Sequence, residues 1–394
     1  MISMGTADSL PEIATRVAAI RRDVHAHPEL AFAERRTAEL VASQLERLGV
    51  ETHRGIAGTG VVGRLRRGSS DRAIGLRADM DALPLDELND FDHRSRHSGC
   101  MHACGHDGHV AMLLGAAEAL TTTSRFDGSV YFIFQPAEEH EGGGRLMVEQ
   151  GLFERFPMQA VFGLHNWPGL AAGQIAVMPG AVMAGADRFE IRLSGRGGHA
   201  AMPQQADDIV LAGSVLVQAV QTLFARNTDP LEPAVLSVTR FHAGQADNIL
   251  PERALLGGTL RSFSTSQQVL MEEGMGRICA GIAAAYGVAI DLSIERGYPP
   301  TINSPAETDL CRAVATEVFG AENLRADLRP SMGAEDFSYL LQARPGCYVW
   351  LGNGMGEGGC MLHSPRYDFN DAIIVHGMRY WLHLVERALP LTAL

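Results

Sequence analysis

The chain has 394 residues, more than one hydrophobic core usually serves, so we expect two domains. Its hydrophobic content of 46% and charged content of 20% are typical of a soluble globular protein, and its net charge of −13 argues against nucleic acid as a partner. We therefore expect a small-molecule substrate.

The sequence shows no sign of a targeting or membrane segment. No basic start followed by an apolar run lies near Met1, and we expect no later stretch to span a bilayer. Six cysteines are scattered along the chain, which predicts reduced thiols and no disulfide framework. These features predict a cytoplasmic protein without a membrane partner.

Two helices are predicted between Leu10 and Leu48, where apolar residues recur at helical spacing. His27-Pro28 interrupts the pattern, and Gly49 ends the second helix. A histidine beside such a break is more often a hydrogen-bonded structural residue than a metal ligand, so we assign His25 and His27 no catalytic role.

Residues 58–63 (GTGVVG) match the dinucleotide-binding pattern G-x-G-x-x-G. That pattern must follow a strand and open a helix. Here residues 61–65 look like a strand themselves and lead to a second strand at 73–76. We therefore predict a hairpin of these two strands and exclude NAD.

Three apolar segments, 73–78, 129–134 and 160–164, each run into acids or histidine, and 347–352 is a fourth strand of this kind. An apolar helix is predicted at 110–120, between the first two. Alternating strands and helices indicate a mostly parallel, doubly wound α/β sheet whose site lies beyond the carboxyl ends of the strands.

Residues 100–109 (CMHACGHDGH) hold three histidines, two cysteines and an aspartate. Gly105 and Gly108 allow the backbone to turn tightly, so that these side chains can converge. Imidazole and thiolate together form a ligand set for zinc or a similar transition metal. The segment therefore predicts a metal site.

The segment 184–297 has the order βαββαβ, which is the ferredoxin-like arrangement. We expect a catalytic domain formed by 1–183 and 298–394, with 184–297 inserted as a smaller lid and dimerisation domain. Joints at Pro179-Gly180 and at 297–300 (GYPP) suit hinges.

Four motifs carry a resemblance to a known family: 104–109 (CGHDGH), 136–139 (PAEE), 195–203 (GRGGHAAMP) and 331–337 (SMGAEDF). In this order they resemble the hippurate hydrolase and auxin-conjugate hydrolase branch of the aminoacylase/carboxypeptidase metallohydrolases, over nearly the whole chain. The resemblance implies a dinuclear metal site with Glu138 as general base, and a lid that often makes the dimer contact. The ligands it implies are Cys104, His106, Glu139, His165 and His363.

The adjacent acids Glu138 and Glu139 suit amide hydrolysis, which needs a strong nucleophile and stabilisation of the oxyanion. Side chains that follow a strand point in different directions, so one carboxylate can bind metal while the other holds the attacking water. Asp79 is expected either to orient a ligand histidine or to cap its turn.

Three residues of the insert are candidates for substrate contacts. His199 lies in a glycine-rich loop and could meet the oxyanion, while Asn248 and Arg261 could meet a substrate carboxylate. Arg261 taken alone would be read as surface charge; the resemblance assigns it to substrate.

The predicted function is hydrolysis of an N-acyl amino acid, hippurate-like, to a carboxylic acid and a free amino acid. A dipeptidase, an acyl-diaminopimelate deacylase and a non-catalytic metal-dependent binding protein are the alternatives. Two divalent ions are expected, zinc or manganese first and cobalt or nickel as further options. A homodimer is expected, and whether His199 serves its own or the neighbouring subunit stays open.

Overall fold

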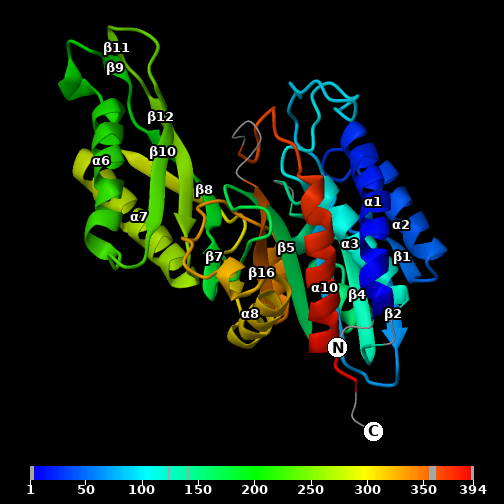
Figure 1. The fold of residues 1–394 in the computed structure, drawn as a ribbon. Coiled ribbons are helices and arrows are strands. Elements are labelled where there is room, and N and C mark those ends of the chain that lie inside the picture. The colour runs from blue at the N-terminus through cyan, green and yellow to red at the C-terminus, as the bar shows by residue number, and fades with distance from the viewer. Residues whose placement is uncertain (1–3, 123–124, 140–141, 355–360, 392–394) are drawn as a thin grey trace. The chain divides into compact units, whose positions relative to one another are not determined.

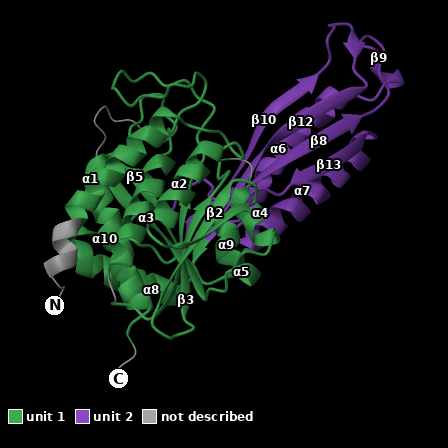
Figure 2. Cartoon of the chain, turned by 90° about the vertical axis from the view of Figure 1, so that its right-hand side faces the viewer, with its two compact units in different colours: residues 1–180, 302–329, 336–394 green, residues 181–301, 330–335 purple. Residues whose placement is uncertain are grey.

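The computed structural model describes residues 4–122, 125–139, 142–354 and 361–391 (Figure 1). Two compact units are coloured separately in Figure 2. Unit 1 comprises 1–180, 302–329 and 336–394, and unit 2 comprises 181–301 and 330–335. The expected boundaries lie within a few residues of these, except that 330–335 was expected in the catalytic domain.

Unit 1 is built on an eight-stranded sheet in the order β1-β2-β4-β3-β5-β16-β6-β15. Its centre is parallel, because β3 pairs in parallel with β4 and β5, and β5 with β16. The bounds are β1 (Glu51–Ile56), β2 (Gly60–Arg67), β3 (Ala73–Asp79), β4 (Gly128–Gln135), β5 (Ala160–Pro168), β6 (Ile175–Ala176), β15 (Leu324–Arg325) and β16 (Gly346–Gly354).

Helices cover both faces of this sheet. Cys347, Val349 and Leu351 of β16 pack into the large core that includes α3 and α10, whereas Tyr348 contacts Phe337 of α9. This is the expected doubly wound arrangement. The helices of unit 1 are α1 (Met4–Ala26), α2 (Arg35–Arg47), α3 (His106–Thr121), α4 (Gly143–Glu149), α5 (Leu152–Arg155), α8 (Pro305–Phe319), α9 (Phe337–Ala343) and α10 (Ile374–Ala388).

The N-terminal helix break and the buried strands agree with the sequence predictions. β3 and β4 are buried at every position, as is usual for parallel strands covered on both faces. His27, at the break, hydrogen-bonds through Nδ1 to the carbonyl of Asp23 at 2.9 Å. The five cysteines among the described residues are free and buried, and Cys360 lies outside the described residues.

The predicted hairpin is wrong in its partner. β2 forms its hairpin with β1, which precedes it, and β4 separates β2 from β3 in the sheet. The sequence 51–56 (ETHRGI) is mostly exposed or half-buried, so it lacks the apolar alternation that would have revealed a strand. NAD was excluded because residues 58–63 (GTGVVG) were not expected to open a helix. In the structure they lie in the β1–β2 hairpin and open no helix.

Unit 2 is a four-stranded antiparallel sheet in the order β10-β12-β8-β13, the order of a ferredoxin-like unit. Phe189, Ile191 and Leu193 alternate along β8 and enter the core under α6 and α7. The bounds are β7 (Gly180–Met183), β8 (Gly185–Ser194), β9 (Gly198–His199), α6 (Ile209–Asn227), β10 (Ala234–Ala243), β11 (Ile249–Leu250), β12 (Arg253–Ser262), α7 (Thr265–Tyr286) and β13 (Ala289–Glu295). The short strand β14 (Thr301–Asn303) begins at the last residue of this segment of unit 2 and continues into unit 1.

The expectation that no segment is long and apolar enough to span a bilayer is wrong. Helix α6 is long and apolar enough to cross a membrane by length and composition. Leu216, Val220 and Leu223 of α6 lie in the core of unit 2, while Val210 and Leu211 are exposed. Its high hydropathy arises because it carries apolar residues on a buried and on an exposed face.

Candidate metal centre

The segment 100–109, which we call the metal loop, runs into α3 at His106. Gly105, the residue before the helix, has φ of 92°, and a Cβ there would lie 2.3 Å from Oδ1 of Asn166. Only glycine fits both the backbone conformation and this close approach. The turn sets Cys104 and His106 on the two sides of Gly105, at the carboxyl ends of the central strands.

The structure brings the five expected ligands together. Ligand atoms of Cys104, His106 and Glu139 all lie within 4.8 Å of one another. Sγ of Cys104 lies 3.4 Å from Nε2 of His165, and Nε2 of His363 lies 3.1 Å from Oε1 of Glu139. Four separate segments of unit 1 therefore meet at one point.

These residues fit divalent metal ions. Nε2 of His106 is buried and has no hydrogen-bond partner among the described residues, and the buried Oε1 of Glu139 is in ion-pair contact with Nε2 of His363. A buried polar atom without a hydrogen bond is costly, so a bound cation is a natural partner for Nε2 of His106. The sulfur, nitrogen and oxygen donors suit zinc and several other transition metals.

The charges around the site also favour a cation. Burial lowers the pKa of His106, but Asp79, Asp81 and Glu139 outweigh it and raise this pKa to about 10. Burial and the nearby Glu139 and Glu138 raise the pKa of the Cys104 thiol well above its usual value. A metal ion would replace the proton on each and hold Cys104 as the thiolate.

Asp81 orients two of the expected ligands, a role the sequence reasoning missed. Nδ1 of His106 hydrogen-bonds to the carbonyl of Asp81 at 2.9 Å, which leaves Nε2 for a metal. The backbone N–H of Glu139 donates to Oδ2 of Asp81 at 2.9 Å. Asp81 lies two residues after Asp79, the last residue of β3, and this spacing was the available signal.

Asp79 contacts a histidine that was given no role. Its Oδ1 accepts from Nδ1 of His109 at 2.6 Å, while its Oδ2 lies 3.7 Å from Nε2 of His106. His109 in turn accepts from the backbone N–H of Asn166 at 3.0 Å. His109 stands one helical turn from His106 on α3, so the two rings lie side by side at 5.6 Å.

The expected general base and its neighbour diverge in the turn after β4. Glu138 is buried, and its Oε1 accepts from the backbone N–H of Asp336 at 3.4 Å. Glu139 turns instead to Cys104 and His363. The divergence expected for a strand end is therefore present, although both acids lie in a turn.

Asp336, from the motif 331–337, fixes this turn from the other side. Its carboxylate accepts from Arg77 at 3.0 Å, from Nε2 of Gln135 at 2.7 Å and from the N–H of Gly144 at 2.7 Å. Arg77 and Asp336 are both buried. The motif thus contributes a buried ion pair, Asp336 with Arg77, beside the turn 136–139 that carries Glu138 and Glu139, which we call the acid turn.

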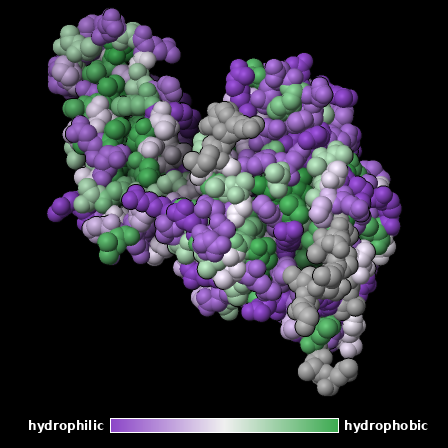
Figure 3. Space-filling model, in the orientation of Figure 1, coloured by the Kyte–Doolittle hydropathy of each residue, from purple (hydrophilic) through white to green (hydrophobic). Residues whose placement is uncertain are grey.

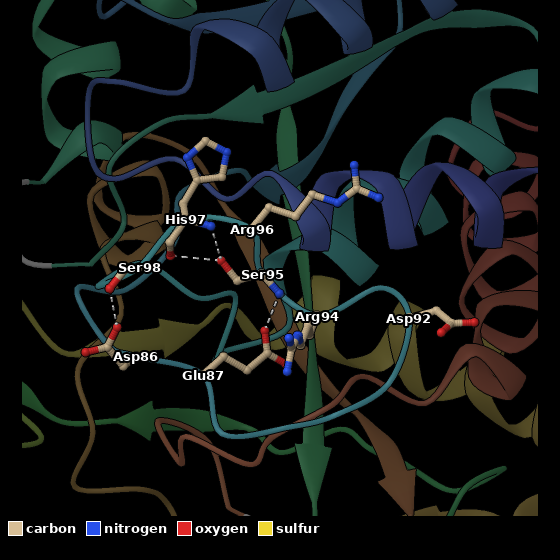
Figure 4. Close-up of a pocket in the computed structure, with 8 residues that line it drawn as sticks. All are labelled: Asp86, Glu87, Asp92, Arg94, Ser95, Arg96, His97 and Ser98. Atoms are coloured by element: carbon tan, nitrogen blue, oxygen red, sulfur yellow. Dashed lines mark hydrogen bonds between the residues drawn. The ribbon is translucent and has the colours of Figure 1, made fainter.

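A second buried network supports the metal loop from α1. His25 hydrogen-bonds through Nδ1 to Asp107 at 2.8 Å and through Nε2 to Glu87 at 3.2 Å. Glu87 also accepts from the N–H of Ser95 at 2.6 Å, which folds the loop 86–98 around a hollow of about 480 Å³ (Figure 4). His25 therefore ties this loop to the metal loop.

Unit 2 brings together two of its three expected residues. His199 and Asn248 line one pocket of about 420 Å³, and the N–H of Ala200 donates to the carbonyl of Asn248 at 3.0 Å. Both lie near the start of β12, because β11 pairs with β9 and Arg253 pairs with Ser194. Arg261 lies eight residues beyond Arg253 on β12, which is about 26 Å along the strand at the usual rise per residue.

Comparison with known proteins gives the same family as the motifs. The model of "Peptidase family M20/M25/M40" matches residues 75–387. Hippurate hydrolase of Campylobacter jejuni is 41% identical over 94% of this chain and 96% of its own. IAA-amino acid hydrolase ILR1-like 4 of Arabidopsis thaliana is 37% identical over 94% and 85%, and thermostable carboxypeptidase 1 of Saccharolobus solfataricus is 37% identical over 93% of each chain.

A solved structure agrees over the same length. The YxeP protein of Bacillus subtilis, described as a dinuclear metal binding peptidase, is 32% identical with a TM-score of 0.85, over 96% of this chain and 99% of that one. The fold class and the family resemblance are thereby confirmed. The chain belongs to peptidase family M20/M25/M40 and is a hydrolase of amide bonds.

Proposed function

We propose that the protein cleaves N-acyl amino acids to a carboxylic acid and a free amino acid, with an aromatic acyl group as in hippurate. The observation that carries the proposal is the convergence of five side chains able to bind metal beside the buried acid Glu138. The similarity to a hippurate hydrolase and an IAA-amino acid hydrolase supports the acyl amino acid as substrate.

Cys104, His106, Glu139, His165 and His363 would hold two divalent ions, with zinc or manganese expected first and cobalt or nickel as further options. When bound, such a pair acidifies water and polarises the scissile carbonyl. Glu138 accepts the proton of the attacking water and returns it to the leaving nitrogen. The N–H of Asp336 holds the Glu138 carboxylate in place for both transfers.

His199, Asn248 and Arg261 would contact the substrate, His199 at the oxyanion and the other two at the carboxylate. The span of about 26 Å along β12 exceeds the length of an N-acyl amino acid, so one copy of unit 2 cannot bring Asn248 and Arg261 to the same substrate. This supports a homodimer in which each site receives His199 and Asn248 from one copy and Arg261 from the other.

The surface of unit 2 supports the dimer as well. β10 is an edge strand, and Val235 and Phe241 on it are exposed, as are Val210 and Leu211 on α6. Figure 3 shows hydrophobic residues reaching the surface of this unit among polar ones. An unpaired edge beside exposed apolar side chains suits association with a second copy.

A substrate panel with each metal in turn tests the function. We expect amino acid release from benzoyl-glycine, and a smaller rate from acetyl-glycine. Faster release from dipeptides would favour a peptidase, in line with the similarity to a carboxypeptidase, and release from acyl-diaminopimelate would favour that deacylase. Binding of N-acyl amino acids without turnover by any metal form would indicate a binding protein.

Elemental analysis of the active form should give two metal ions per chain, and chelation should abolish activity.

Mixed subunits test the dimer. Glu138→Gln and His199→Ala should each be inactive alone, and exchange should restore up to about a quarter of the activity if His199 acts across the interface. No recovery despite verified exchange would place His199 in its own subunit. We also propose a cytoplasmic location, which cell fractionation would test.

A further inference from the structure

The turn that presents Glu138 has an unfavourable backbone conformation. Ala137 is fully buried and has φ of 54°, in the left-handed region that residues other than glycine rarely adopt. Such a conformation persists only where the surroundings enforce it. The position of Glu138 therefore depends on whatever holds Ala137.

The side chain of Glu34 holds Ala137 directly. Glu34 precedes α2, is fully buried, and accepts the backbone N–H of Ala137 through Oε1 at 2.8 Å. Its Oε2 accepts from the hydroxyl of Thr59 at 2.6 Å. One carboxylate thus joins α2, the turn between β1 and β2, and the turn of the general base.

The glycine-rich segment 58–63 completes this contact. A Cβ on Gly60 would lie 2.4 Å from the carbonyl oxygen of Ile56 and 3.1 Å from Cδ of Pro136. The hairpin therefore packs against Pro136 without space for a side chain. The segment that resembles a dinucleotide fingerprint serves here to support the acid turn.

The opposite side of the turn is equally close-packed. A Cβ on Gly143 would lie 1.8 Å from the carbonyl oxygen of Pro136, and the N–H of Gly143 donates to the carbonyl of Ala137 at 2.9 Å. Both peptide groups of Ala137 are thus hydrogen-bonded, one to Glu34 and one to Gly143.

We propose that Glu34 is a positioning residue for Glu138, acting through Ala137 without touching substrate or metal. This inference rests on the proposed role of Glu138 as general base. A displacement of that carboxylate by about 1 Å can cost about 10²-fold in rate, because proton transfer needs close alignment. Glu34 should therefore affect turnover more than substrate binding.

The test compares three variants of the metal-loaded full chain on the best substrate of the panel. Glu34→Leu removes both acceptors at similar size and should lower kcat about 10²-fold, with KM and metal content near those of the wild type. Glu34→Gln should restore kcat to within a few-fold, because its Oε1 can accept from Ala137 while its amide donates to Thr59.

The matched control is Glu29→Leu. Glu29 accepts the N–H groups of Arg36 and Thr37 at 2.9 Å each and so caps the same helix without contacting Ala137. It should lower the melting temperature and leave kcat unchanged. An unchanged kcat in Glu34→Leu, or an equal loss in both variants, would overturn the proposal.

If Glu34→Leu does not fold, Thr59→Val replaces it, with Thr59→Ser as its rescue and Thr52→Val as its control in β1. Thr52 donates to the carbonyl of Val50 and lies outside this contact. Amide hydrogen exchange gives a readout that needs no substrate: the Ala137 N–H should exchange faster in Glu34→Leu and at the wild-type rate in Glu29→Leu. Unaltered exchange refutes the contact, whereas faster exchange in a chain that cleaves no N-acyl amino acid refutes only the proposed function.

Discussion

The polar residues around the metal centre of unit 1 and the expected substrate residues of unit 2 differ in burial. In unit 1 the charged side chains of Arg77, Asp79 and Asp336 are buried, each within a set of hydrogen bonds and ion pairs. In unit 2 His199 and Asn248 are exposed, and the core beneath them is apolar. Buried interactions within unit 1 therefore hold the residues behind its metal centre, whereas His199 and Asn248 of unit 2 face solvent and would need substrate or a second copy as partner.

This contrast has an energetic basis. Buried charges are tolerated only where each is paired, so loss of one partner leaves another charge buried and unpaired. Substitutions in unit 1 should thus have large effects, on chemistry at the metal centre and on stability behind it. Substitutions at the exposed residues of unit 2 should leave folding nearly unchanged and act on substrate or on assembly.

The largest effect is expected at Glu138. Glu138→Gln should keep metal and substrate binding but lower kcat about 10²–10⁴-fold, because the amide cannot accept a proton from water. Glu139→Gln should lower metal occupancy instead. Stopped assays with parallel elemental analysis distinguish the two, and exchanged phenotypes would require the base and ligand roles to be exchanged.

The next effect concerns His25 and stability. Burial lowers its pKa, but Asp107 and Glu87 outweigh burial and raise it from 6.5 to about 9. Because the folded value lies above the unfolded one, the stabilisation is full below about pH 6.5 and is lost as pH rises through about 9. It amounts to about 3 kcal/mol.

Urea unfolding of His25→Gln at about pH 6, 7.5 and 9 measures this. The difference from the wild type should shrink steadily toward high pH. His27→Gln, at a partly exposed neighbour that hydrogen-bonds to a backbone carbonyl, is the control and should show only a small difference in the free energy of unfolding. A pH-independent loss in His25→Gln would mean that the residue contributes packing and no charge.

The sequence predicted most of the architecture because the period of its apolar residues is strong where elements are buried. The βαββαβ order of unit 2 could be predicted because residues such as Phe189 and Ile191 alternate clearly. β1 was missed because an edge strand with polar residues on both faces has no such period. β2 also pairs with β4, which lies about 60 residues farther along the chain, and the local sequence pattern gives no information about such a distant partner.

At the candidate site, too, the sequence revealed residues that lie in local motifs and missed those whose role depends on tertiary contacts. Cys104, His106 and Glu139 were identified because metal-ligating residue types lie close together in motifs, and their roles as ligands stay predictions. Asp81, Asn166 and Glu34 were missed because they act through hydrogen bonds to backbone or to other side chains. Such roles depend on tertiary placement, and an aspartate or glutamate near a strand end or helix start has many other uses.

In unit 2, Arg261 is expected to read the substrate carboxylate. Arg261→Ala should lower kcat/KM for N-acyl amino acids about 30-fold, or about 2 kcal/mol, and far less for their amide analogues, since only the acids lose a charged partner. Arg253→Ala, at the other end of β12, is the matched control. Equal losses for acids and amides would show that Arg261 supports the unit structurally.

The smallest effect on folding, and the most direct test of the contrast, is expected at Leu211. Its side chain is 51% exposed on α6, so Leu211→Lys should change the free energy of unfolding of an isolated chain by about 0.5 kcal/mol or less. If α6 and the edge strand β10 meet a second copy, a buried lysine ammonium without a partner should nevertheless dissociate the dimer.

The control is Val269→Lys, which makes the same kind of change on α7, where Val269 is 44% exposed. Sedimentation velocity across a concentration series should show monomer for Leu211→Lys and dimer for Val269→Lys, with turnover lost in the first because its sites lack the residues of the second copy. A Leu211→Lys chain that stays dimeric and active would move the interface away from α6.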